Sequence, residues 1–203
     1  GYTTAIGALP VGASFAALPA INQARPTVTS AGTSVTLSTN NTLRGLNLTS
    51  TGGTTLSGTS FGTLTASAIS ITGGLPALNL NTGTAAATFD SLTATGGATG
   101  VNLTALAGSL TINGGAISGS TSTAFAVTSG TANITYAGSI AAGAGVRSVN
   151  VANKTAGIVS FTGGVNGTGT GISLTTNTGA TINFTGGISL STGANAAFTA
   201  TGG

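Results

Sequence analysis

A six-residue signature recurs along the chain and limits what it can fold into: apolar, polar, apolar, then Thr-Gly-Gly. Eight copies, two of them imperfect, end at Gly53, Gly74, Gly97, Gly115, Ser139, Gly164, Gly187 and Gly203. The intervals between these ends are 21, 23, 18, 24, 25, 23 and 16 residues, which average about 21. A repeat of this length is typical of the coils of a solenoid.

Within each copy, apolar and polar positions alternate as they do in a half-buried strand. The first position is always apolar: Leu48, Ile69, Leu92, Leu110, Ile134, Val159, Ile182 and Phe198. The second is always small and polar, and the third is mostly apolar. The signature therefore predicts a strand that turns sharply at Gly-Gly. A second alternating triplet precedes it in most coils, at 78–80, 101–103, 125–127, 149–151, 172–174 and 188–190.

These features favour an all-β fold, a parallel β-helix (β-solenoid) of about eight coils of about 21 residues. Helix-forming Glu, Met, Lys, Gln and Arg are absent or scarce, whereas Thr and Val favour strands and Gly and Asn favour turns. A β-sandwich does not need identical columns in eight copies, and a β-propeller repeat is twice as long. Parallel strands cross over in the right-handed sense, so we expect a right-handed coil.

We expect two parts in the chain, an irregular N-terminal cap at 1–33 and the repeat array at 34–203. The apolar run 5–21 contains Pro10 and Pro19, so it does not fit a membrane span, although it is conceivable as a signal-peptide core. The array reaches Gly203 with no polar cap after the last signature. We therefore expect that end to be part of a longer array or to receive another molecule.

The chain has only five charged residues, Arg25, Arg44, Arg147, Lys154 and Asp90, and these exclude several classes of function. Nucleic-acid binding needs cations gathered on one face, and these four are scattered. Glycosidic or acid–base chemistry needs at least two suitable groups, and Asp90 is the only acid. No His or Cys is present, and a calcium-loaded solenoid needs an Asp in each turn. We expect no catalytic residue, metal or cofactor.

Two segments carry a resemblance to a known group of proteins. The segments 138–164, with Arg147-Ser-Val-Asn-Val, and 171–187 resemble repeats of large secreted bacterial β-strand-repeat proteins. They are similar to autotransporter passengers and to filamentous-haemagglutinin-like adhesins. The similarity covers roughly 34–203 and is strongest after about 116. It implies a parallel β-helix, export to the cell surface or medium, and no cofactor.

The leading hypothesis is a structural or adhesive scaffold, or the subunit of an extracellular fibre. Its partners would be copies of itself stacked end to end, further repeats of a longer chain, or a surface glycan, host or biofilm ligand. Low charge removes the usual guard against edge-to-edge assembly, which favours the fibre. Seven Asn-x-Ser/Thr sequons, at Asn40, Asn47, Asn102, Asn133, Asn153, Asn166 and Asn183, leave glycosylation open.

The alternative is ice binding by an outward face of stacked Thr-x-Thr pairs. In the alignment above these pairs form a lattice with about 4.8 Å between coils and about 6.7 Å along each strand. Thr is also a common outward residue of ordinary strands, so the pattern has a purely structural reading. The candidate residues are Thr49, Thr51, Thr72, Thr93, Thr95, Thr111, Thr162, Thr185, Thr199 and Thr201.

Overall fold

The computed structural model describes residues 24–74 and 76–202, and in this part of the chain the regular structure is entirely strand. The first nine strands are β1 (Thr27–Ser30), β2 (Val35–Leu37), β3 (Asn41–Ser50), β4 (Leu56–Thr59), β5 (Thr63–Gly73), β6 (Leu78–Thr95), β7 (Thr99–Ile112), β8 (Gly115–Ser118) and β9 (Thr123–Gly130). The others are β10 (Asn133–Tyr136), β11 (Ser139–Ala142), β12 (Arg147–Ala152), β13 (Ile158–Phe161), β14 (Val165–Gly167), β15 (Gly171–Thr175), β16 (Thr181–Phe184), β17 (Ile188–Leu190) and β18 (Phe198–Thr201).

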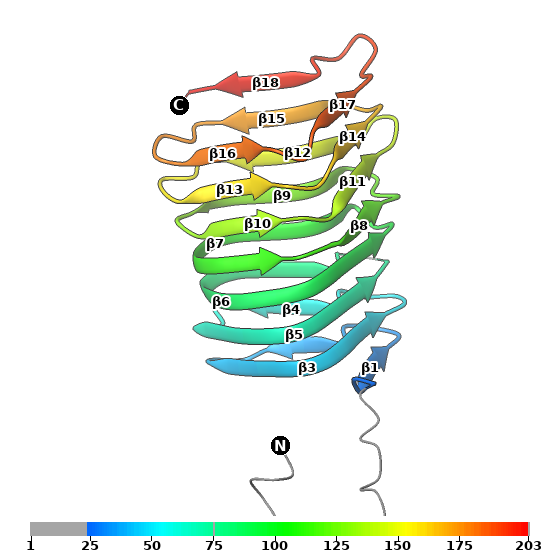
Figure 1. Ribbon diagram of the computed structural model, residues 1–203, viewed down its shortest axis with the longest axis vertical. Coiled ribbons are helices and arrows are strands. Elements are labelled where there is room, and N and C mark those ends of the chain that lie inside the picture. The colour runs from blue at the N-terminus through cyan, green and yellow to red at the C-terminus, as the bar shows by residue number, and fades with distance from the viewer. Residues whose placement is uncertain (1–23, 75, 203) are drawn as a thin grey trace, which may run out of the picture.

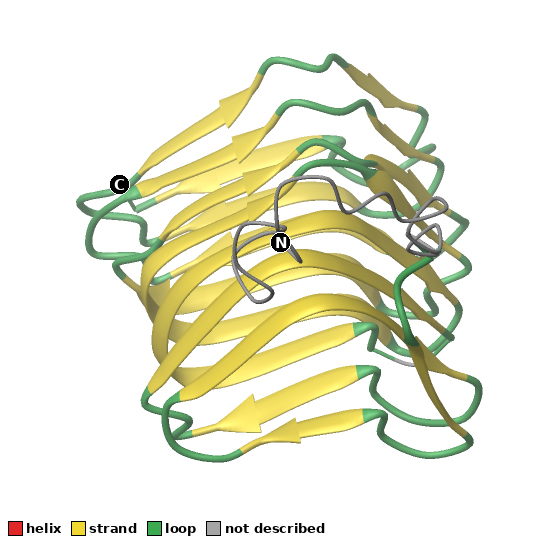
Figure 2. Ribbon diagram, turned by 60° about the horizontal axis from the view of Figure 1, so that its bottom comes forward, coloured by secondary structure: helices red, strands yellow, loops and turns green. Residues whose placement is uncertain are grey.

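The strands stack along the long axis of the molecule, from β1 near one end to β18 at the other (Figure 1). In a view tilted so that the β1 end comes forward, the strands wrap around a common interior and are joined by loops (Figure 2). Every pairing is parallel, and each strand pairs with the one a coil below or above it. The result is a β-solenoid of about 8 turns, which confirms the predicted parallel β-helix. Its right-handed sense stays a prediction.

Three faces make up each coil. Face A holds β2, β4, the starts of β6 and β7, then β9, β12, β15 and β18. Face B holds the first parts of β3 and β5, the middle of β6, the end of β7, then β10, β13 and β16. Face C holds β1, the ends of β3, β5 and β6, then β8, β11, β14 and β17.

Apolar side chains from the three faces fill a continuous core. On face A the preceding triplets form one register-matched inward column: Leu78, Val101, Phe125, Val149 and Ile172. All five are fully buried. The prediction of this second strand is confirmed for five of its six triplets. The sixth, 188–190, is β17 on face C, and Phe198 of β18 continues the face A column instead.

The signature strands do not form the single column that the sequence alignment predicts. Leu110, Ile134, Val159 and Ile182 are paired in register on face B, as expected. The first three copies lie instead at the ends of β3, β5 and β6 on face C, where Leu48 pairs with Ile71 rather than Ile69. The last copy is β18 on face A. The alignment is therefore wrong where it joins copies from different faces. It is also wrong for the copy that starts at Ile69, which is two residues out of register with its neighbours on face C.

A left-handed corner recurs once per coil where face A turns into face B. Its residues have φ between 49° and 66°, and only the last is a glycine: Asn40, Ser60, Thr82, Ala105, Ser129, Asn153, Thr176 and Gly202. Positive φ is costly for residues other than Gly, although Asn tolerates it better than most. The pairing of successive coils stabilises this corner, because backbone N–H groups at it, such as those of Ser60, Asn153 and Thr176, donate to carbonyls of the coil above.

The solenoid starts earlier than the predicted boundary at residue 34. Strand β1 already pairs with β3 through Thr27 to Ser30, and the Asn47 N–H donates to the Pro26 carbonyl. The predicted apolar run 5–21 lies outside the described residues. The described remainder of the expected cap, from residue 24, therefore belongs to the first coil.

Candidate functional site

The last coil ends the described core in a layer of exposed apolar side chains. Among the described residues, β16, β17 and β18 each pair on one side only, with β13, β14 and β15. Ile188 is 44% exposed, whereas its partner Val165 is 1% exposed. Phe198 is 47% exposed, whereas its partner Ile172 is fully buried. We call β16, β17 and β18 with their inward side chains the C-terminal layer.

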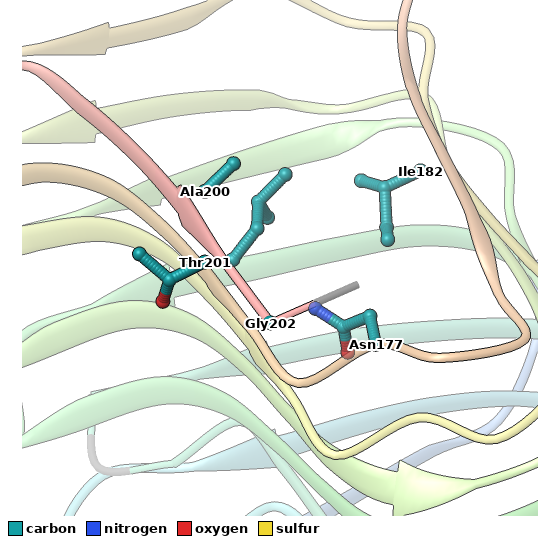
Figure 3. Close-up of a pocket in the computed structure, with 6 residues that line it drawn as sticks. Asn177, Ile182, Ala200, Thr201 and Gly202 are labelled. Carbon is teal, nitrogen blue, oxygen red and sulfur yellow. The ribbon is translucent and has the colours of Figure 1, made fainter.

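A hollow of about 240 Å³ opens in this layer. Ala200 and Ile182 lie on opposite sides of it, with Asn177 and Gly202 at its lower edge (Figure 3). Leu174 and Thr201 complete the lining. The lining of the hollow is mainly apolar, so it suits an apolar group better than a charged ligand.

An aromatic row rises through the core to this layer. The ring centroids of Phe125 and Phe161 are 5.2 Å apart, and those of Phe161 and Phe184 are 5.0 Å apart and nearly parallel. Phe184 contacts Phe198 edge-on at 6.0 Å. Phe125 and Phe161 are buried, and Phe198 is exposed. The row therefore ends with one aromatic side chain open to solvent.

The ten candidate threonines do not share one face. Thr49, Thr72, Thr93 and Thr95 lie on face C, Thr111 lies on face B, and Thr199 and Thr201 lie on face A. Thr51, Thr162 and Thr185 directly follow strands, in the connecting loops. The predicted lattice of all ten on a single surface is therefore not formed, because the copies that carry them belong to three faces.

A smaller register-matched ladder does exist on face C. Thr29, Thr49, Thr72 and Thr93 are consecutive partners on β1, β3, β5 and β6. The neighbouring outward positions Thr27, Asn47, Ser70 and Ser91 form a second row beside it. Ala116 of β8 follows Thr93 and ends the hydroxyl ladder. Thr29 could not be placed in it from the signature, since β1 carries no Gly-Gly.

The charged side chains are dispersed and mostly have structural partners. Arg25 and Asp90 form an ion pair, with 2.5 Å between Nη1 and Oδ2. Arg147 donates from Nη1 to the Thr170 carbonyl at 3.1 Å, and Arg44 is exposed on β3. In the described ranges no group of three or more His, Cys, Asp or Glu residues is placed to hold a metal ion.

Lys154 is the unusual charge, because it is fully buried. Its Nζ donates to the carbonyls of Ala132 at 3.0 Å and Gly130 at 3.4 Å. Its backbone N–H donates to Oδ1 of Asn177, whose Nδ2 donates to the Val151 carbonyl. Burial lowers the pKa of the Lys154 ammonium below its ordinary value. This burial could not be predicted from the sequence, because nothing in the pattern around Lys154 marks it as inward-facing.

Comparisons of the chain with known protein families, with curated proteins and with solved structures find no match. Within the described residues, no helix is long and apolar enough to cross a membrane. The resemblance to secreted bacterial β-strand-repeat proteins stays a prediction.

Proposed function

We propose that the protein is a non-enzymatic structural or adhesive scaffold of the bacterial surface or extracellular matrix, which lengthens end to end into a fibre. The observation that carries this proposal is the solenoid itself, in which parallel strands stacked on three faces enclose one continuous apolar core. Its coils stack through parallel strand pairing into a rod whose outward positions include Thr, Ser and Asn. Such a rod can present partners at a distance without any chemistry of its own.

Immunogold labelling of the source cells tests the location. Label on the cell exterior or in the surrounding matrix is the expected result, and label confined to the cell interior would overturn the proposal. A strain that lacks the protein tests the role, because a scaffold or adhesin should contribute to surface attachment or matrix cohesion. Unchanged attachment and cohesion in that strain would argue against both roles.

Ice binding is a second candidate, favoured by the ladder of Thr29, Thr49, Thr72 and Thr93. Its two rows of polar side chains repeat about every 4.8 Å along the axis, which gives a regular polar surface. An ice-recrystallisation assay decides the matter. If the ladder binds ice, Thr72→Lys on face C should abolish the activity and Thr111→Lys on face B should leave it. A wild-type chain without activity would exclude this candidate.

A further inference from the structure

The sequence contains two Asn-Gly pairs, Asn113-Gly114 and Asn166-Gly167. Asn is one of the thermolabile residues, because the backbone nitrogen of the next residue can attack its side-chain amide. Glycine hinders that attack least, since it has no side chain. Asn113 and Asn166 are both exposed, and neither side-chain amide hydrogen-bonds to another described group. The two pairs therefore share the same intrinsic chemistry, and only the backbone around them differs.

The peptide group that joins Asn113 to Gly114 is free to turn. These two residues form the corner between β7 and β8, in the middle part of the stack (Figure 1). The Asn113 N–H donates to the Phe89 carbonyl at 2.9 Å, and the Gly114 carbonyl accepts from the Leu92 N–H at 3.0 Å. Between these two anchors, the Asn113 carbonyl and the Gly114 N–H have no hydrogen-bond partner among the described residues. This peptide group can rotate without breaking a hydrogen bond.

The corresponding peptide group of Asn166-Gly167 is held on both sides. Both residues belong to β14 and are paired in register with β11 below and β17 above. Parallel ladders on the two sides engage the backbone donors and acceptors of such a strand. Gly167 is also buried. The attack requires the peptide group to turn towards the Asn side chain, and here that turn has to break ladder hydrogen bonds.

We propose that Asn113 is a site of spontaneous deamidation in the folded protein, and that Asn166 is protected from it. The Gly114 nitrogen bonds to Cγ of Asn113, and the bond from Cγ to Nδ2 breaks. The proton lost from the Gly114 nitrogen leaves with Nδ2 as ammonia. Water then opens the resulting succinimide ring to aspartate or isoaspartate. The reaction needs only water, and the inference does not depend on the role as a scaffold.

The product would change a part of the rod that has almost no charge. Asn113 follows Ile112, which pairs with Phe89, so it lies one coil above Asp90, the only acid in the sequence. The new carboxylate lowers the formal net charge of +3 by one. Isoaspartate also adds a main-chain carbon between the Asn113 N–H and the Gly114 carbonyl, the two groups that bond to β6. The spacing of these anchors would then no longer match β6.

Trypsin separates the two sites for a direct test. Cleavage after Arg44, Arg147 and Lys154 places Asn113 in peptide 45–147 and Asn166 in peptide 155–203. The folded chain is incubated at mildly alkaline pH and digested at intervals, and a zero-time sample gives the background. Mass spectrometry should show OH replacing NH2 in peptide 45–147, with fragment ions placing the change at residue 113. Asn166 should react at least about tenfold more slowly, because its ladder hydrogen bonds have to break first.

The unfolded chain is the internal control. In guanidinium chloride the two Asn-Gly pairs should deamidate at similar rates, because the fold no longer distinguishes them. Peptide 155–203 therefore has to gain the same mass change there that it lacks in the folded protein.

Two alanine variants test the attacking nitrogen. A Cβ at Gly114 would lie 3.7 Å from the Asp90 carbonyl oxygen, which is an ordinary contact, so Gly114→Ala should fold. Its methyl group hinders the attack and should slow deamidation of Asn113 several-fold. Gly143→Ala is the matched control, because a Cβ there meets nothing within 4 Å, and it should leave the rate unchanged. Circular dichroism of both variants checks that they keep the β-sheet spectrum.

Four results would overturn the inference. Equal rates at the two sites in the folded chain would show that the ladder does not protect Asn166. Faster reaction of Asn166 would reverse the assignment. An unmodified Asn113 in a folded chain whose unfolded form reacts would show that the corner holds its peptide group after all. An unchanged rate in folded Gly114→Ala would mean that the Gly114 nitrogen is not the attacking group.

Discussion

At the scale of single residues, Lys154 makes the free energy of unfolding depend on pH in the alkaline range. The folded state holds the ammonium against the carbonyls of Ala132 and Gly130, and burial lowers its pKa. As pH rises from the folded pKa towards the ordinary value of 10.5, the unfolded chain still binds a proton that the folded chain has lost. The free energy of unfolding should therefore rise through that window.

Lys154→Met isolates this effect. Tyr136 is also fully buried, and burial raises the pKa of its hydroxyl, so its contribution to stability falls above about pH 10. Below about pH 10 the Tyr136 effect is absent, so the Lys154 effect can be measured alone. Urea unfolding from pH 7 to 10 should show stability increasing in the wild type relative to Lys154→Met. A difference between the two proteins that does not change with pH would contradict the prediction.

A second residue-scale prediction concerns the backbone at Gly115. Its φ is +107°, and a Cβ there would lie 2.0 Å from the Leu92 carbonyl oxygen. Gly115→Ala should therefore destabilise the fold by about 2 kcal/mol or more. Gly143 is the matched control, because a Cβ there would meet nothing within 4 Å. Gly143→Ala should change the unfolding free energy by no more than about 0.5 kcal/mol. Equal effects in urea unfolding would refute the assignment of strain.

At the scale of strands, the register between β3 and β5 is testable with introduced cysteines, since the chain has none. Thr49 pairs with Thr72, so their Cα atoms lie about 4.8 Å apart, whereas Ser70 is two residues off register and about 8 Å from Thr49. Disulfides form when Cα atoms are within about 7 Å. Under mild oxidation, Thr49→Cys/Thr72→Cys should lose its thiols and Thr49→Cys/Ser70→Cys should keep them. The opposite outcome would restore the register that the signature predicts.

The sequence was enough to predict which segments form strands, but it predicted only in part the face on which each strand lies. Alternation depends on local side chains, so Leu110, Ile134, Val159 and Ile182 were aligned correctly. Gly-Gly, in contrast, fits any sharp turn. It follows face C up to Gly97, face B from Gly115 to Gly187, and face A at Gly203. The two shortest intervals, 18 and 16 residues, are the places where the signature moves to another corner.

The corner that does recur once per coil leaves no mark in the sequence. Asn, Ser, Thr, Ala and Gly all occupy it, because pairing between coils rather than side-chain identity holds it in the left-handed region. In the candidate site, Ile182 and Phe184 were predictable as inward-facing residues of a signature strand. The exposed side chains and the hollow were not, since they depend on which strands share the last layer.

At the scale of the whole molecule, stability should depend on where along the stack a contact is lost. In a solenoid each coil contacts only its neighbours, so a central coil is held from two sides and a terminal coil from one. Phe161 is 1% exposed and contacts the rings of both Phe125 and Phe184. Phe161→Ala should therefore cost about 3–5 kcal/mol. Phe198→Ala, measured at low concentration, should cost less than about 1 kcal/mol, because Phe198 is 47% exposed.

Hydrogen exchange distinguishes the two variants. Phe161→Ala should speed exchange in the coils above and below it, and Phe198→Ala only in β16, β17 and β18. Equal costs for the two variants, with exchange accelerated evenly along the chain, would mean that the rod unfolds as one unit rather than coil by coil.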